Sequence, residues 1–168
     1  LAMALLAFSY AVFQERPTMA GPLAQESAAI LDRLGAVFMR GMARRVVIAT
    51  QFATGVSPEG LRAARDDMAL ALSKTQLTLA AALASTTFPA IARDAPAACL
   101  RLWAVRRRVV GTDRRHDLER AGLSLPEDVD ALMRETADKT LSDAVKDVLA
   151  ALDRVIAAQE TGTAMGRA

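Results

Sequence analysis

The residues of this sequence best suited to binding chemistry are arginines, and they occur in three clusters: Arg40, Arg44 and Arg45; Arg106, Arg107 and Arg108; and Arg114 and Arg115. Arg40 and Arg44 lie four positions apart, so in a helix they project from the same face. Two converging guanidinium groups can hold a small anion through charge-assisted, bidentate hydrogen bonds. We therefore expect a small-anion site at Arg40 and Arg44. The alternative is a solvated face whose arginines pair with acidic side chains of the last segment, namely Glu127, Asp128, Asp130, Asp138, Asp143 and Asp147.

Reactive side chains are few. His116 is the only histidine and Cys99 the only cysteine, which excludes an internal disulfide and leaves too few ligands for a zinc site. His116 follows Arg114 and Arg115 and is expected in a solvated loop, and Cys99 is expected in the core. The sequence thus predicts no catalytic residue, no metal site and no cofactor, and we expect the protein not to be an enzyme.

The composition indicates helices as the elements that position these residues. Alanine and leucine together supply about a third of the 168 residues, glycine and proline are scarce, and aromatic residues make up 4%. The net charge of +2 is too small to indicate a nucleic-acid-binding surface, so no nucleic-acid partner is expected. The fold class expected is all-α.

The first thirteen residues, LAMALLAFSYAVF, form a nearly unbroken apolar run that meets Glu15, Arg16 and Pro17. The run is shorter than the ~20 residues that span a bilayer as a helix. We expect residues 1–20 to be the end of a signal peptide or transmembrane segment, and residues 21–168 to form a helical-bundle, sensor-like domain. The alternative is a buried N-terminal helix of that domain.

Apolar stripes with steps of three and four residues predict four helical segments. They run from Leu23 to about Thr54, from Ser57 to about Thr86, from Asp94 to Gly111, and from Ser124 to Gly162. Ser57 and Asp94 are expected to cap the second and third helices, and Ser124 and Glu127 have the spacing of a capping box before the last. Gly55 is expected to end the first segment, and Gly35 and Gly41 inside it mark a close contact or a weak point. Four such segments are typical of an up-and-down four-helix bundle with long first and last helices.

Short motifs in three of these segments resemble a known family. Residues 33–44 read RLGAVFMRGMAR, Leu102-Trp103 lies in the third segment, and Leu141 is followed by Ser-Asp-Ala144-Val145. These motifs resemble the N-terminal sensor domain of type IV pilus methyl-accepting chemotaxis transducers, related to the periplasmic domain of nitrate/nitrite-sensing histidine kinases. The resemblance implies a sensory helical bundle outside the cytoplasmic membrane, with anion binding in the nitrate-sensing relatives.

Two functions remain open at this point. One is a periplasmic or membrane-anchored sensory domain that binds a small anion, forms a homodimer through its first helix and acts in signal transduction or chemotaxis. The other is a cytoplasmic helical adaptor or regulator that binds another protein and has no small-molecule ligand.

Overall fold

The structure, a computed structural model, describes residues 1–13, 15–54 and 57–165, and these residues fold entirely as helices and connections. The expectation of an all-α fold is confirmed. The described residues form ten helices: α1 (Ala2–Phe13), α2 (Pro17–Arg33), α3 (Val37–Thr54), α4 (Pro58–Ser73), α5 (Leu77–Thr86), α6 (Phe88–Ile91), α7 (Pro96–Val110), α8 (Arg115–Arg120), α9 (Val129–Glu135) and α10 (Leu141–Met165).

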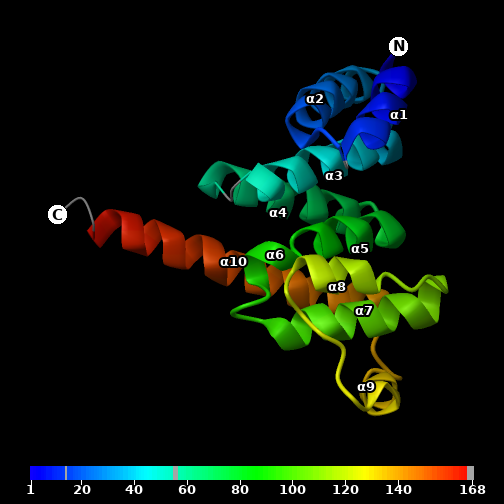
Figure 1. The fold of residues 1–168 in the computed structure, drawn as a ribbon, viewed down its shortest axis with the longest axis vertical. Helices are drawn as coiled ribbons and strands as arrows, with labels where there is room; N and C mark the ends of the chain where they lie inside the picture. The colour runs from blue at the N-terminus through cyan, green and yellow to red at the C-terminus, as the bar shows by residue number, and fades with distance from the viewer. Residues whose placement is uncertain (14, 55–56, 166–168) are drawn as a thin grey trace.

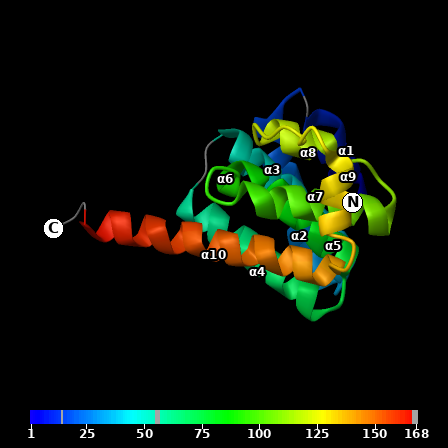
Figure 2. The same cartoon turned by 90° about the horizontal axis from the view of Figure 1, so that it is seen from below.

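The helices stack along the long axis of the molecule (Figure 1). Helices α1 and α2 lie at one end and α3 crosses below them; we call these three helices the N-terminal layer. Helices α4 to α10, which we call the main body, make up the rest, with α9 at the opposite end. The C-terminal part of α10 projects beyond the other helices in both views (Figures 1 and 2).

The expected long first helix is broken at Gly35. Its φ of +66° lies in the left-handed region, and the amide of Ala36 donates to the carbonyl of Leu31 at 2.9 Å, which closes the end of α2. Gly41 has the other predicted role, because a Cβ there would overlap the Leu79 side chain of α5. One glycine therefore ends a helix, and the other allows α3 to approach the main body closely.

The expected second helix is also interrupted, at Thr75. This residue has a φ of +57°, and the Gln76 amide donates to the Ala71 carbonyl at 2.9 Å, as at the end of α2. A β-branched residue rarely adopts this conformation, so the residue type carries no signal for the break. The segment forms α4 and α5.

Two of the predicted helix boundaries are confirmed and one is wrong. The Ser57 hydroxyl accepts a hydrogen bond from the Gly60 amide at 3.0 Å, as expected of a helix cap, and Gly111 ends α7 with a φ of +80°. Asp94 does not cap α7, because Ala95 occupies the N-cap position and makes no side-chain cap. Gly55 lies outside the described residues.

The last segment differs most from its prediction. Ser124 and Glu127 form no capping box; instead Asp128 caps α9 by accepting from the Ala131 amide at 2.7 Å. The chain then leaves the helix between Glu135 and Leu141 before α10 begins, and α10 continues through Gly162. An isolated glycine inside a helix costs only about 1 kcal/mol relative to alanine, so Gly162 alone does not stop the helix.

The N-terminal apolar run folds as α1, with Ala2, Leu6 and Ser9 buried. The Ser27 hydroxyl of α2 donates to the Ala2 carbonyl at 2.8 Å, which fastens α1 to its neighbour. In the part of the chain that the structure describes, no helix combines the length and apolarity needed to cross a membrane.

Candidate functional site

Arg40 and Arg44 converge as the sequence predicts, but the anionic group that they contact is a side chain of the protein itself, Asp67. The Arg44 Nε lies 2.7 Å from the Asp67 Oδ2 of α4, and the Arg40 Nη2 lies 3.4 Å from the Asp67 Oδ1. Arg40 also reaches Asp32 at 3.3 Å. The cavity beside this cluster measures about 10 Å³, which is room for about one water molecule.

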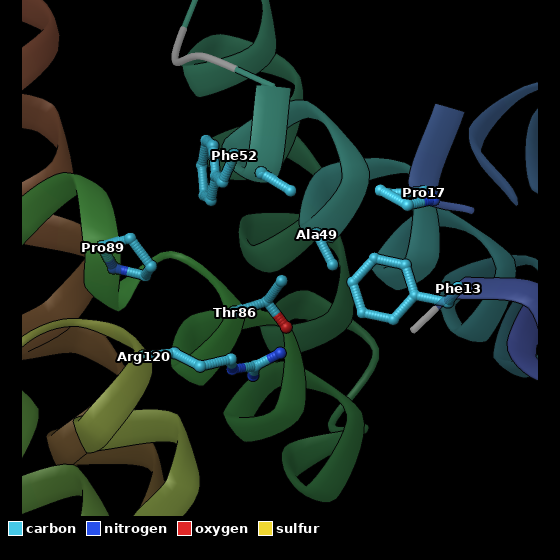
Figure 3. Close-up of a pocket in the computed structure, with 8 residues that line it drawn as sticks. Phe13, Pro17, Ala49, Phe52, Thr86, Pro89 and Arg120 are labelled. Atoms are coloured by element: carbon cyan, nitrogen blue, oxygen red, sulfur yellow. The ribbon is translucent and has the colours of Figure 1, made fainter. Parts of the chain in front are cut away.

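A larger hollow lies where the N-terminal layer meets the main body (Figure 3). Its volume is about 320 Å³, and apolar side chains form most of its wall. Phe13 and Phe52 point into it from α1 and α3, while Thr86, Pro89 and Arg120 face them from the main body (Figure 3). We call this hollow the apolar lobe.

A second hollow of about 490 Å³ adjoins the apolar lobe, and both are lined by Phe13, Ala49, Thr86 and Arg120. Cationic groups dominate its polar wall, so we call it the cationic lobe. The remaining residues that line it are Tyr10, Arg45, Val46, Arg114 and His116. None of the described residues lining either lobe is acidic.

One buried carboxylate behind the cationic lobe holds its arginines in place. The Asp117 side chain is 1% exposed, and its Oδ2 accepts from the Arg114 Nε at 3.2 Å. Its Oδ1 accepts from the Arg120 Nη2, and the His116 Nε2 lies 3.4 Å from the same oxygen. Because each guanidinium carries five N–H groups, both arginines retain donors beyond those directed at Asp117.

Arg106 adds a third guanidinium group around Asp117, from α7. Its side chain is 8% exposed, its Nη1 lies 3.6 Å from the Asp117 Oδ2, and it donates to the Ser85 hydroxyl at 3.1 Å. Burial above all, together with the positive charges of Arg114 and Arg45, lowers the pKa of Arg106 to about 10 against the opposing effect of Asp117. Its buried Nε has no hydrogen-bond partner among the described residues.

The positive charge of this cluster is therefore only partly balanced. Arg45 donates to the Thr86 hydroxyl at 3.4 Å, a neutral partner. Arg106, Arg114 and Arg120 share Asp117. An anion entering the cationic lobe would meet excess positive charge in a partly desolvated setting, where a charge interaction is stronger than in bulk water.

Cys99 and His116, the two residues considered for chemistry, differ in burial. Cys99 is fully buried in α7, as predicted, and burial raises the pKa of its thiol to about 12. His116 is solvent-exposed, but it lies in α8 and not in a loop. Within the described part of the chain, no three potential metal ligands gather.

Several other arginines pair as a solvated face would. Arg62 and Arg65 reach Glu160 and Asp153 of α10, acids other than those expected. Arg107 lies over the Trp103 ring at 5.4 Å. Arg108 donates to the carbonyls of Thr136 and Lys139 at 3.0 and 2.6 Å, which closes the connection between α9 and α10.

Sequence reasoning identifies Arg45, Arg106 and Arg114 as members of clusters but misses Phe13, Phe52 and Arg120 as lining residues. These three residues come from distant parts of the chain, and no local spacing joins them.

Comparison with known proteins finds no matching family model, no similar curated protein and no similar solved structure. The resemblance to chemotaxis-transducer sensor domains stays a prediction.

Proposed function

We propose that this chain is a non-enzymatic helical domain that binds a small anion in the cationic lobe between the N-terminal layer and the main body. The observation that carries the proposal is the cluster of three guanidinium groups, those of Arg106, Arg114 and Arg120, around the single buried carboxylate of Asp117, with Arg45 lining the same lobe. The lobe of about 490 Å³ has the size of a typical small-molecule site.

The cationic lobe supports anion binding better than the Arg40 and Arg44 pair does. Asp67 already accepts hydrogen bonds from both of those arginines, and the cavity beside them is small. An external anion there would have to displace Asp67. Anion binding at Arg40 and Arg44 is therefore a separate prediction, which the same experiment can examine.

The sensory part of the proposal follows from the position of the lobe. A ligand that contacts both α3 and α8 would strengthen the attachment of the N-terminal layer, and a change in that attachment is a signal that a partner can read. Within this proposal the four predicted segments form the bundle of a sensor-like domain, although the first is divided into α2 and α3, the second into α4 and α5, and the last into α9 and α10. A periplasmic or membrane-anchored setting belongs to the same proposal.

Isothermal titration calorimetry with inorganic phosphate, nitrate and short carboxylates tests the proposal. We expect at least one of these anions to bind the wild-type protein, and the Arg114→Gln/Arg120→Gln variant to lose at least tenfold in affinity. Arg101→Gln is the matched control, because Arg101 forms an exposed ion pair with Glu135 away from the lobe. Binding lost in Arg40→Gln/Arg44→Gln alone would move the site to Asp67, and no binding of any anion would overturn the proposal.

Exposed apolar side chains favour a second candidate, protein binding. Of the nine large apolar side chains exposed among the described residues, eight precede residue 40, including Leu34 and Phe38 at 72% and 49% exposure. Such a surface suits either an adaptor partner or the expected homodimer contact of the first helix. Sedimentation velocity on wild-type protein and on Leu34→Ser/Phe38→Ser distinguishes them, because only a homodimer dissociates in the variant without any added partner.

A further inference from the structure

We infer that the ligand of this site is an organic carboxylate with a short hydrocarbon or aryl body. The inference rests on the proposed function and names its ligand class. Its basis is the adjoining position of two lobes: one carries Arg45 and Arg114 in its wall, and the other has a mostly apolar wall.

The apolar lobe is shaped to receive a hydrocarbon body. Phe13 and Phe52 present their rings to it from the N-terminal layer, and Pro89 faces them from the main body (Figure 3). An inorganic anion would occupy only the cationic lobe and leave this apolar wall in contact with water. Burying a hydrocarbon there tightens binding by about fourfold for each methylene group.

The cationic lobe is suited to a carboxylate head group. Arg120 lines both lobes, and Figure 3 shows its guanidinium end reaching toward Thr86, at the boundary between them. Arg114 and Arg45 line the adjoining cationic lobe. The planar fork of a guanidinium group matches the two oxygens of a carboxylate, so a head group placed at Arg120 leaves the attached chain directed toward Phe13.

The position of Asp117 allows Arg114 and Arg120 to bind an anion without a large rearrangement of their side chains. Asp117 is covered by the arginines it orients, and it is absent from the described lining of both lobes. The guanidinium groups of Arg114 and Arg120 are held by one carboxylate that does not line the lobe, so a ligand carboxylate can approach them from the lobe without displacing it. This differs from Asp67, which occupies the space between Arg40 and Arg44 itself.

Calorimetric titration with three probes tests the ligand class: sodium octanoate, octylammonium chloride and inorganic phosphate. We expect octanoate to bind at least tenfold more tightly than phosphate, and octylammonium to show no saturable binding. Across acetate, butanoate, hexanoate and octanoate, affinity should rise by up to about fourfold per methylene until the apolar lobe is full.

The outcomes separate this inference from the proposed function. Phosphate bound as tightly as octanoate would overturn the inference and leave anion binding standing. Octylammonium bound as tightly as octanoate would overturn both, because charge would then play no part. If none of the three probes binds, the inference fails, and the proposed function fails with it unless nitrate binds.

Variants of the apolar lobe supply a second, independent test. Ala49 lines both lobes from α3, and Ala49→Leu fills their shared space with a residue that favours helices. We expect it to weaken octanoate at least tenfold and phosphate less than threefold. Phe52→Ser should show the same selectivity, with Phe38→Ser as the control, since Phe38 is an exposed aromatic residue on the same helix but lines neither lobe. Equal weakening of both probes in Ala49→Leu and Phe52→Ser would overturn the inference.

Discussion

The N-terminal layer and the main body are both helical, but they bury different kinds of side chains. The main body encloses large residues such as Phe88, Met68 and Leu102, all at most 1% exposed. The layer buries mostly alanine and valine, in two small clusters, with Leu6 and Leu31 as its largest members. Since hydrophobic stabilisation scales with the apolar area buried, the layer is the less stable of the two regions.

Polar contacts and one shared residue compensate for this difference at the boundary. Ile48 extends from α3 into the core of the main body. Asp67 of α4 pairs with Arg40 and Arg44, which also belong to α3. Arg45 adds a hydrogen bond to Thr86. The candidate site lies along this boundary, where a ligand can contribute most to holding the two regions together. A weakly attached layer beside a stable body thus suits a binding domain whose ligand changes its conformation.

The largest expected effect comes from the core of the main body. Phe88→Ala should lower the free energy of unfolding by ~4 kcal/mol, because it removes a fully buried aromatic ring. Leu31→Ala should instead loosen the N-terminal layer alone. Urea unfolding followed by the fluorescence of Trp103, which lies in the main body, should shift strongly for the first variant and little for the second. Similar shifts in both would show that the two regions unfold as one unit.

The second largest effect is expected at the contact between the N-terminal layer and the main body. Asp67→Asn removes the charge shared by Arg40 and Arg44 and should cost ~2 kcal/mol in the attachment of the layer, because its carboxylate is 10% exposed. Amide hydrogen exchange should accelerate in α2 and α3 and remain unchanged in α7. Asp153→Asn is the matched control, since its ion pair with Arg65 is exposed and contributes little to stability. Uniform acceleration in all helices would contradict the prediction.

Alkaline pH should destabilise the main body through Cys99. The pKa of its thiol is raised to about 12 by burial, so between pH 9 and 12 the native state keeps a proton that the unfolded state releases, and stability falls as pH rises. The lowered pKa of Arg106 acts in the opposite direction from about pH 10 upward. Between pH 8 and 10 the wild-type protein should lose ~1 kcal/mol more than Cys99→Ala, measured by urea unfolding. Parallel pH profiles would show that the thiol titrates normally in the native state.

How much the sequence predicts depends on the range of the interactions involved. Ser57 and Gly111 act locally, through a cap and a left-handed residue, and the sequence predicts both boundaries. Thr75 ends a helix in a conformation that its residue type disfavours, so only the surrounding packing can explain that break. The candidate site joins Phe13 to Arg120 across the fold, and no helical period relates such distant positions.

The smallest effects are expected from replacing one glycine in each region by alanine. Gly35 and Gly111 both have a positive φ, and a Cβ added at either would meet no other group within 4 Å, so an alanine would suffer backbone strain but no steric clash. Each substitution should cost ~1 kcal/mol. Gly35→Ala should raise hydrogen exchange only in the N-terminal layer, because the strain falls on the turn between α2 and α3. Gly111→Ala should lower the midpoint of the Trp103 transition, since Gly111 ends the helix that carries Trp103. If Gly35→Ala moved that midpoint equally, the layer would share the cooperative unfolding of the main body, and the boundary between them would not be a point of separate opening.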